Sequence, residues 1–99
     1  MKEFDKAKQF YHHKEYQKAI DMVIDIIGRN VITSKSIEYP DIICCLGDSR
    51  LKLYDITKNK SLIYEALTDY ATAANSLLVH QKTFLNDLNQ RQRKCTELL

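Results

Sequence analysis

The scarcity of glycine and proline constrains the fold of this chain more than any other feature. Two glycines and one proline occur among 99 residues, and residues 61–99 contain neither type. Strands joined by tight turns need these residues often, whereas long helices with few connections do not. Apolar residues recur at steps of three and four, and no segment alternates for long between apolar and polar residues. We therefore expect an all-α fold without a sheet.

Five segments show this helical period, and they predict one domain built of antiparallel helical hairpins. The first two segments form a hairpin over residues 2–28, which Gly28 ends. The next two form a hairpin over residues 39–78, opened by Pro40, because a proline in the first helical turn loses no needed N–H. A terminal helix follows over about 82–98.

The boundary between the last two helices leaves an alternative open. A stripe of apolar and small residues begins at Leu62 and continues through Leu77, and a second stripe begins at Phe84. We place a break near residues 78–82. One long bent helix over residues 61–97 is the alternative, since no glycine or proline interrupts this part of the chain.

Composition and charge limit the partners and the location. The formal charge of +2 is too small to indicate binding to nucleic acid. No apolar run approaches the roughly 20 residues that span a bilayer, so no membrane insertion is expected. Three cysteines, two of them adjacent at Cys44 and Cys45, indicate free thiols in a reducing compartment. We expect a cytoplasmic or nuclear protein.

The cysteines and histidines do not form a recognisable metal site. Cys44 and Cys45 would point about 100° apart on a helix, so they would not share one metal ion, and we expect buried thiols. His12 and His13 fall in a predicted turn, and His80 lies far along the chain. We expect all three histidines at the surface and no metal.

Motifs for catalysis are also missing from the sequence. There is no GxSxG, no HExxH and no phosphate-binding glycine loop, since Gly28 and Gly47 stand alone. A basic cluster of Arg91, Arg93 and Lys94 fits the C-terminal end of a helix without any functional role. We predict a protein that is not an enzyme and uses no cofactor.

Small and aromatic residues follow the pattern of a known repeat. In the first hairpin the landmarks are Ala7, Phe10, Tyr16, Ala19, Val23 and Ile26. In the second hairpin they are Leu46, Gly47, Ala66, Tyr70 and Ala73. Both sets resemble the tetratricopeptide repeat (TPR), in which small residues mark where two antiparallel helices touch and aromatic residues fill the adjacent gaps. The resemblance implies a short TPR-like array of about five helices.

The sequence departs from the TPR pattern in three respects. Ala66 follows Ala19 by 47 residues, whereas the family's period is about 34. Arg50 stands where the pattern has an aromatic residue. Two repeats are also fewer than the three that such stacks usually require. The second hairpin is therefore expected to have a longer arm or loop, with the terminal helix acting as a cap.

The resemblance implies a binding groove lined by the first helix of each pair. The predicted groove residues are Phe4, Lys8, Tyr11, His12, Cys44, Asp48, Leu51 and Lys52. The expected partner is a helix or an extended peptide of another protein, held by a protein-interaction module or a small scaffold subunit of a larger assembly. Members of the family that clamp acidic chaperone tails carry a Lys and an Asn at positions that hold Phe4 and Lys8 here, so that role is not expected.

Two other classes of protein remain as alternatives. The run from Tyr16 to Ile20 also resembles MIT domains, which are three-helix trafficking modules. Such a module would leave residues 30–60 without a hairpin partner. A structural oligomerisation bundle is the second alternative, and it would self-associate without leaving a free groove.

Overall fold

The computed structural model describes residues 2–99, except for the side chains of Lys2, Val79 and His80. Its helices are α1 (Lys2–His12), α2 (Tyr16–Gly28), α3 (Tyr39–Thr57), α4 (Ser61–Asn75) and α5 (Leu85–Leu98), with a 3-10 helix, η1 (Val79–Phe84), before α5. No strand occurs within residues 2–99, so the predicted all-α class with five helices is confirmed. No helix among these residues has both the length and the apolar character needed to cross a membrane.

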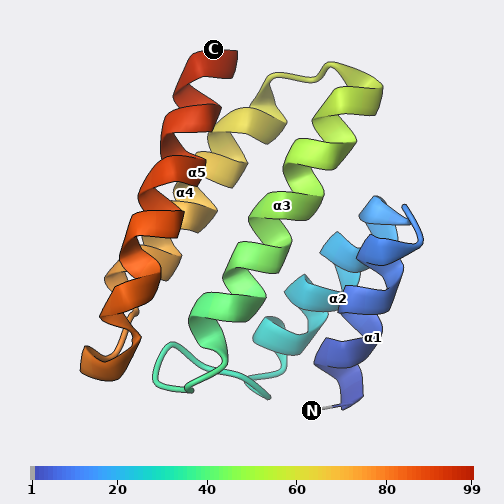
Figure 1. Cartoon of the computed structure of the whole chain (residues 1–99). Coiled ribbons are helices and arrows are strands. Elements are labelled where there is room, and N and C mark those ends of the chain that lie inside the picture. Colours follow the sequence, from blue (N-terminus) through green and yellow to red (C-terminus); the bar gives the residue numbers. More distant parts are fainter. Residues whose placement is uncertain (1) are drawn as a thin grey trace.

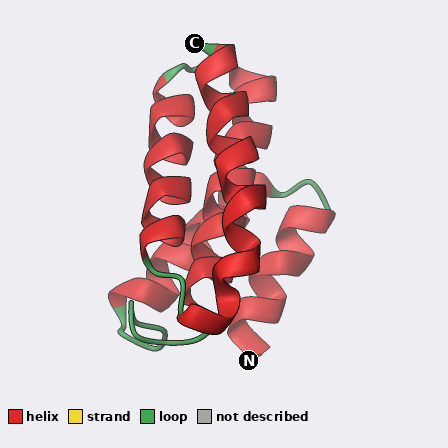
Figure 2. Ribbon diagram, turned by 60° about the vertical axis from the view of Figure 1, so that its left-hand side comes forward, coloured by secondary structure: helices red, strands yellow, loops and turns green. Residues whose placement is uncertain are grey.

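Consecutive helices run antiparallel and pack side by side (Figure 1). α1 packs on α2, α2 on α3, α3 on α4, and α4 on α5. As a result, α1, α3 and α5 all run in one direction, upward in Figure 1, and α2 and α4 run back between them. Figure 2 shows that the connecting loops lie at the ends of the helices, which leaves the long sides of α1, α3 and α5 uncovered by loops.

α4 and α5 are separate helices, so the alternative of one bent helix over residues 61–97 is wrong. Leu78 has an extended backbone, which ends the helical path between them. The N–H of Leu78 donates to Oε1 of Gln81 at 3.0 Å, and Nε2 of Gln81 donates to the carbonyl of Ile37 at 3.0 Å. One side-chain amide therefore closes this turn and ties it to the loop before α3.

The helix ends follow the sequence signals with one difference. Pro40 lies in the first turn of α3, as predicted. Gly28 is the last residue of α2, but the residue in the left-handed conformation is Asn30, with a φ of 58°. Lys14 and Lys58 have the same conformation after α1 and α3, with φ values of 63° and 59°. The chain thus turns after each of these helices without a glycine.

Small residues allow close approach of the helices where the resemblance places them. Ala19 on α2 and Ala66 on α4 are fully buried. Gly47 on α3 lies directly against Tyr70 on α4, and a Cβ atom at Gly47 would come within 2.8 Å of the tyrosine ring. Tyr70 is itself fully buried, so α3 and α4 are packed around this ring.

Replacing Ala19 by leucine tests the register of α2. The larger side chain has no space between α2 and its neighbours, so we expect a loss of about 1–3 kcal/mol in the free energy of unfolding. The same change at Gln17, which is exposed on α2, is the control and should alter stability by less than about 0.5 kcal/mol. Chemical denaturation of both variants measures the difference, and equal midpoints would contradict the assigned register.

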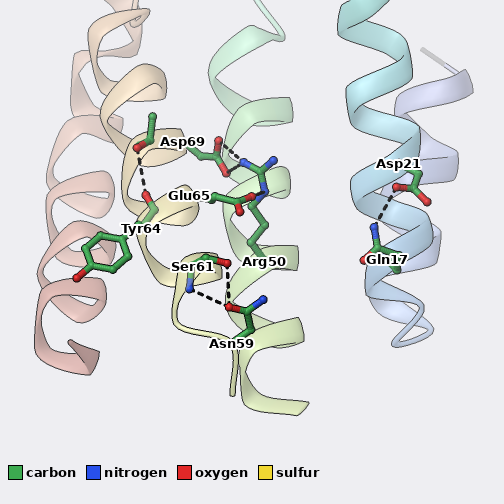
Figure 3. Close-up of polar contacts among 9 residues, drawn as sticks. Gln17, Asp21, Arg50, Asn59, Ser61, Tyr64, Glu65 and Asp69 are labelled. Carbon is green, nitrogen blue, oxygen red and sulfur yellow. Dashed lines mark hydrogen bonds and ion pairs between the residues drawn. The ribbon is translucent and has the colours of Figure 1, made fainter. Parts of the chain in front are cut away.

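Arg50, where the resemblance leads us to expect an aromatic residue, links α3 to α4 (Figure 3). Its Nη1 lies 2.7 Å from Oδ2 of Asp69, and its Nε lies 3.2 Å from Oε2 of Glu65. The side chains of Arg50 and Asp69 are only 15% and 10% exposed. Burial raises the pKa of the Asp69 carboxyl to about 6, against the opposing effect of Arg50. The guanidinium thus keeps a largely buried carboxylate charged near neutral pH.

Candidate functional site

The inner face formed by α1, α3 and α5 contains two adjoining hollows, which together we call the inner groove. The first has a volume of about 330 Å³ and is lined by Lys8, Tyr11, His12, Asp41, Cys44, Cys45, Asp48, Phe84 and Arg91. The second has a volume of about 320 Å³ and is lined by Tyr11, Asp48, Leu51, Lys52, Asp55, Tyr70, Arg91, Lys94 and Leu98. Tyr11, Asp48 and Arg91 belong to both hollows, so they mark the middle of the groove.

α3 forms the floor of the groove, and the two terminal helices form its walls. α1 approaches α3 directly. No Cα atom of α5 comes within 8 Å of a Cα atom of α3 or of α1, so α5 stands apart from the floor. Packed helices have axes about 8–10 Å apart, which would bring such atoms closer. The space between α5 and the other two helices is therefore bridged only by side chains.

Asp48 is the centre of a polar network that joins α3, α4 and α5. The hydroxyl of Tyr70 donates to Oδ1 of Asp48 at 2.6 Å, and Nη1 of Arg91 lies 2.9 Å from Oδ2. Nη2 of Arg91 also pairs with Asp87 at 3.3 Å. Burial raises the pKa of Asp48, while Tyr70 and Arg91 oppose that rise. The network positions Arg91 in the middle of the groove and neutralises the carboxylate there.

Tyr11 is the aromatic residue at the centre of the groove. Its ring packs edge-on against Tyr16, with centroids 5.6 Å apart, and against His12, with centroids 5.5 Å apart. Burial raises the pKa of its hydroxyl, and the charge of Asp48 adds to that effect. Tyr11 is only partly buried. It therefore presents both a ring edge and a neutral hydroxyl to the groove.

The structure brings seven of the predicted groove residues together and places one elsewhere. Lys8, Tyr11 and His12 come from α1, and Cys44, Asp48, Leu51 and Lys52 come from α3. Phe4 does not line the groove: it is 4% exposed and belongs to the core. The reason is visible one turn later on α1, where Nζ of Lys8 lies 4.3 Å from the centroid of the Phe4 ring and covers it. Lys8 then pairs with Asp41 at 3.3 Å.

Cys44 and Cys45 both line the first hollow, and of the two only Cys44 was predicted to lie there. Cys44 is buried and Cys45 is partly buried, and neither forms a disulfide. Burial raises the pKa of Cys44 to about 12 and that of Cys45 to about 11, with Asp48 adding to both. Nη1 of Arg91 contacts Sγ of Cys44. Both groups are therefore neutral thiols at physiological pH, which makes them weak nucleophiles and poor metal ligands.

The remaining candidate residues add no further site within residues 2–99. No three side chains of His, Cys, Asp or Glu among the described residues are arranged to hold a metal ion. His12 and His13 are exposed, as expected. The side chain of His80 lies outside the described part of the chain. Cys95 is a third free thiol, and it is buried against α4 rather than directed into the groove.

No family model, curated protein or solved structure matches the chain. The resemblance to TPR repeats is therefore carried by the quoted residues of this chain alone.

Eight residues that line the groove were not predicted as site residues: Asp41, Cys45, Asp55, Tyr70, Phe84, Arg91, Lys94 and Leu98. Arg91 was explained by the end of a helix, yet it lies between Leu88 and Cys95 on the buried side of α5. An arginine that is spaced three or four residues from apolar residues on one face of a helix is the signal that could have identified Arg91. Phe84 and Lys94 carried no comparable signal, because their place in the groove depends on how α5 stands against α3.

Proposed function

We propose that this protein is a non-enzymatic protein-interaction module, or a small scaffold subunit, of TPR-like design. Its inner groove would hold a helix or an extended peptide of another protein. One observation carries the proposal: seven residues predicted from two separate helices line one continuous groove with an aromatic residue at its centre. Tyrosine suits this position, because it buries a large area while losing little side-chain freedom.

The packing of the second hairpin supports the TPR-like design. Gly47, Ala66, Tyr70 and Ala73 are all buried within the α3–α4 pair, where the repeat pattern has its landmark residues. The longer spacing between the repeats is explained by the 19 residues of α3 and by the loop before it. The groove is then the face that first helices line in a stacked array.

The surroundings of the groove favour binding over chemistry. Its thiols are neutral, and Asp48 is occupied by Tyr70 and Arg91. Three free cysteines are in keeping with a reducing compartment, which places the protein in the cytoplasm or the nucleus in our proposal. The partner we propose is a protein segment, neither a nucleic acid nor a membrane.

One of the two alternatives fits the structure less well, and the other is open to a direct test. A three-helix module like an MIT domain has too few helices to account for this fold, in which α3 pairs with α4 and α5 packs on the other side of α4. An oligomerisation bundle would cover the inner face with a second copy of the chain. Such a dimer would be detected by analytical ultracentrifugation. If changes at Tyr11 disrupted the dimer, the result would favour the hypothesis of an oligomerisation bundle over that of a binding groove.

A double substitution in the groove tests the proposal. Tyr11→Ala with Lys52→Glu removes the central anchor and reverses a charge beside it, so affinity capture of partners from cell extract should fall at least tenfold. Alanine favours a helix at least as well as tyrosine, and Lys52 is exposed on α3, so helicity and melting temperature should change little. Circular dichroism and thermal denaturation check that both variants are folded.

The matched control makes the same two changes on the outer face. Tyr64→Ala with Lys60→Glu lies on and beside α4, where Tyr64 is 59% exposed. This control should leave capture unchanged. The opposite result is loss of capture by the control and full capture by the groove variant. It would indicate that partners bind the outer helices around Glu65 and Asp69, and it would reject the groove as the binding site.

A further inference from the structure

The inner groove is better suited to one kind of segment than to others. We propose that it binds an amphipathic α-helix that lies antiparallel to α3, with an acidic first turn beside Lys52 and Lys94. This inference rests on the proposed function, because it names the segment that the groove holds. It follows from the composition of the groove walls, from their spacing and from the directions of α3 and α5.

The groove walls lack the amide side chains that pair most readily with the backbone of an extended peptide. An extended backbone exposes N–H and C=O groups that must find partners in the groove. Asn and Gln can donate to and accept from such a backbone at once, but none of the described residues that line the two hollows is Asn or Gln. The backbone groups of α1, α3 and α5 are used within the helices. A helix satisfies its own backbone groups and needs only side-chain contacts.

The length of the groove along α3 matches a helix of about four turns. Lining residues on α3 extend from Asp41 to Asp55, which corresponds to roughly 21 Å along a helix. α5 does not approach α3 or α1 directly, so the groove is wide at this side. A helix placed here would pack on α3 between the two terminal helices.

Apolar side chains are spaced along the groove rather than gathered at one point. Phe84 lies at one end, Tyr11 in the middle, and Leu51 with Leu98 towards the other end. All four are partly buried, and each still has surface to offer. This spacing suits a stripe of apolar residues at positions i, i+3 or i+4, and i+7 of the bound helix.

The charges in the groove favour one orientation of the bound helix. Lys8 is paired with Asp41, and Arg91 with Asp48 and Asp87. Lys52 and Lys94, on opposite sides of the second hollow, make no ion pair with any described residue. Asp55 is the one carboxylate beside them without such a pair, so positive charge prevails at this end.

The directions of the helices support the same orientation of the bound helix. α3 and α5 end a few residues beyond Lys52 and Lys94, so the negative ends of two helix dipoles lie at this end of the groove, whereas α1 ends at His12 beside the first hollow. The N-terminus of a bound helix carries the complementary positive end. Helices also favour Asp and Glu in their first turn, and these residues would meet the two lysines.

Selection from a peptide library tests the inference on the intact chain. Random 16-residue peptides are displayed and selected in parallel on the wild-type protein, on the Tyr11→Ala/Lys52→Glu variant and on a Lys52→Glu/Lys94→Glu variant. Peptides enriched on the wild type over the first variant should show an apolar stripe of helical period and Asp or Glu in their first turn. On the second variant, Lys or Arg should replace those acidic residues.

A synthetic copy of the most enriched peptide provides the second measurement. A proline in its centre should weaken binding at least tenfold, because proline breaks the helix. Enriched peptides that lack the helical period, or that tolerate the proline, would overturn the inference while the groove itself stands. An unchanged first-turn preference on the Lys52→Glu/Lys94→Glu variant would overturn the assigned direction. If no peptide distinguishes the wild type from the Tyr11→Ala/Lys52→Glu variant, the proposed function fails as well.

Discussion

Replacing Gly47 by leucine should lower the free energy of unfolding by about 3 kcal/mol, at the upper end of the usual cost of overpacking. The first added atom would already lie 2.8 Å from Cε1 of Tyr70. The ring has little freedom to move away, because it is fully buried and its hydroxyl is bonded to Asp48. Urea denaturation measures the change, with circular dichroism as the probe.

Gly28 provides a matched control for this substitution. It is also helical, but no atom lies within 4 Å of the position that a Cβ would occupy. Gly28→Leu should therefore leave stability unchanged or raise it by up to about 1 kcal/mol, since leucine favours a helix more than glycine does. Similar losses in both variants would show that the effect at Gly47 is not due to contact with Tyr70. A Tyr70→Leu change should partly rescue Gly47→Leu if the contact is the cause.

Removal of Arg50 should have an effect of similar size. Arg50→Met leaves the Asp69 carboxylate buried without its partner, and we expect a loss of about 3 kcal/mol at pH 7. Lys52→Met, on the same helix but exposed and without an ion pair to any described residue, should change stability by less than about 0.5 kcal/mol. A double variant, Arg50→Met with Asp69→Leu, should recover much of the loss, because no buried charge then remains.

The stability that Arg50→Met loses should also depend on pH. In the wild type, the pKa of Asp69 is already raised from 3.8 to about 6, so the native state binds a proton more tightly than the unfolded chain does. The contribution of Asp69 to stability is therefore highest below about pH 4 and falls as pH rises through 6. Without Arg50 the native pKa rises further, so the difference from the wild type should grow between pH 4 and pH 7. A difference that is independent of pH would exclude Asp69 as its origin.

The fold could be predicted from the sequence because its determinants are local. The helical period of the apolar residues and the position of Pro40 are visible in short windows of sequence. The closeness of Ala19 and Ala66 to neighbouring helices could also be inferred, since small residues on an apolar stripe indicate a helix crossing. The break before α5 was harder to predict, because it depends on Gln81 reaching the carbonyl of Ile37 in a distant loop.

The groove could be predicted only in part, because its walls come from parts of the chain far apart in sequence. The repeat pattern placed Tyr11 and Asp48 on one face without any knowledge of α5. It could not show that Lys8 covers Phe4, since that depends on side-chain conformation. Nor could it place Arg91, whose role depends on the separation between α3 and α5.

The arrangement of the walls has a consequence for the local stability of the groove. α3 packs on α2 and α4 and also contacts α1, whereas α1 depends mainly on α2, and α5 mainly on α4 and the short η1. Helices with a single large interface open more often than those in the middle of a stack, and such openings are measured by amide hydrogen exchange. The floor of the groove is thus its most protected part, and both walls belong to the segments that exchange first. A bound segment that touches both walls would slow exchange at the two ends of the chain together, although these ends make no close contact with each other.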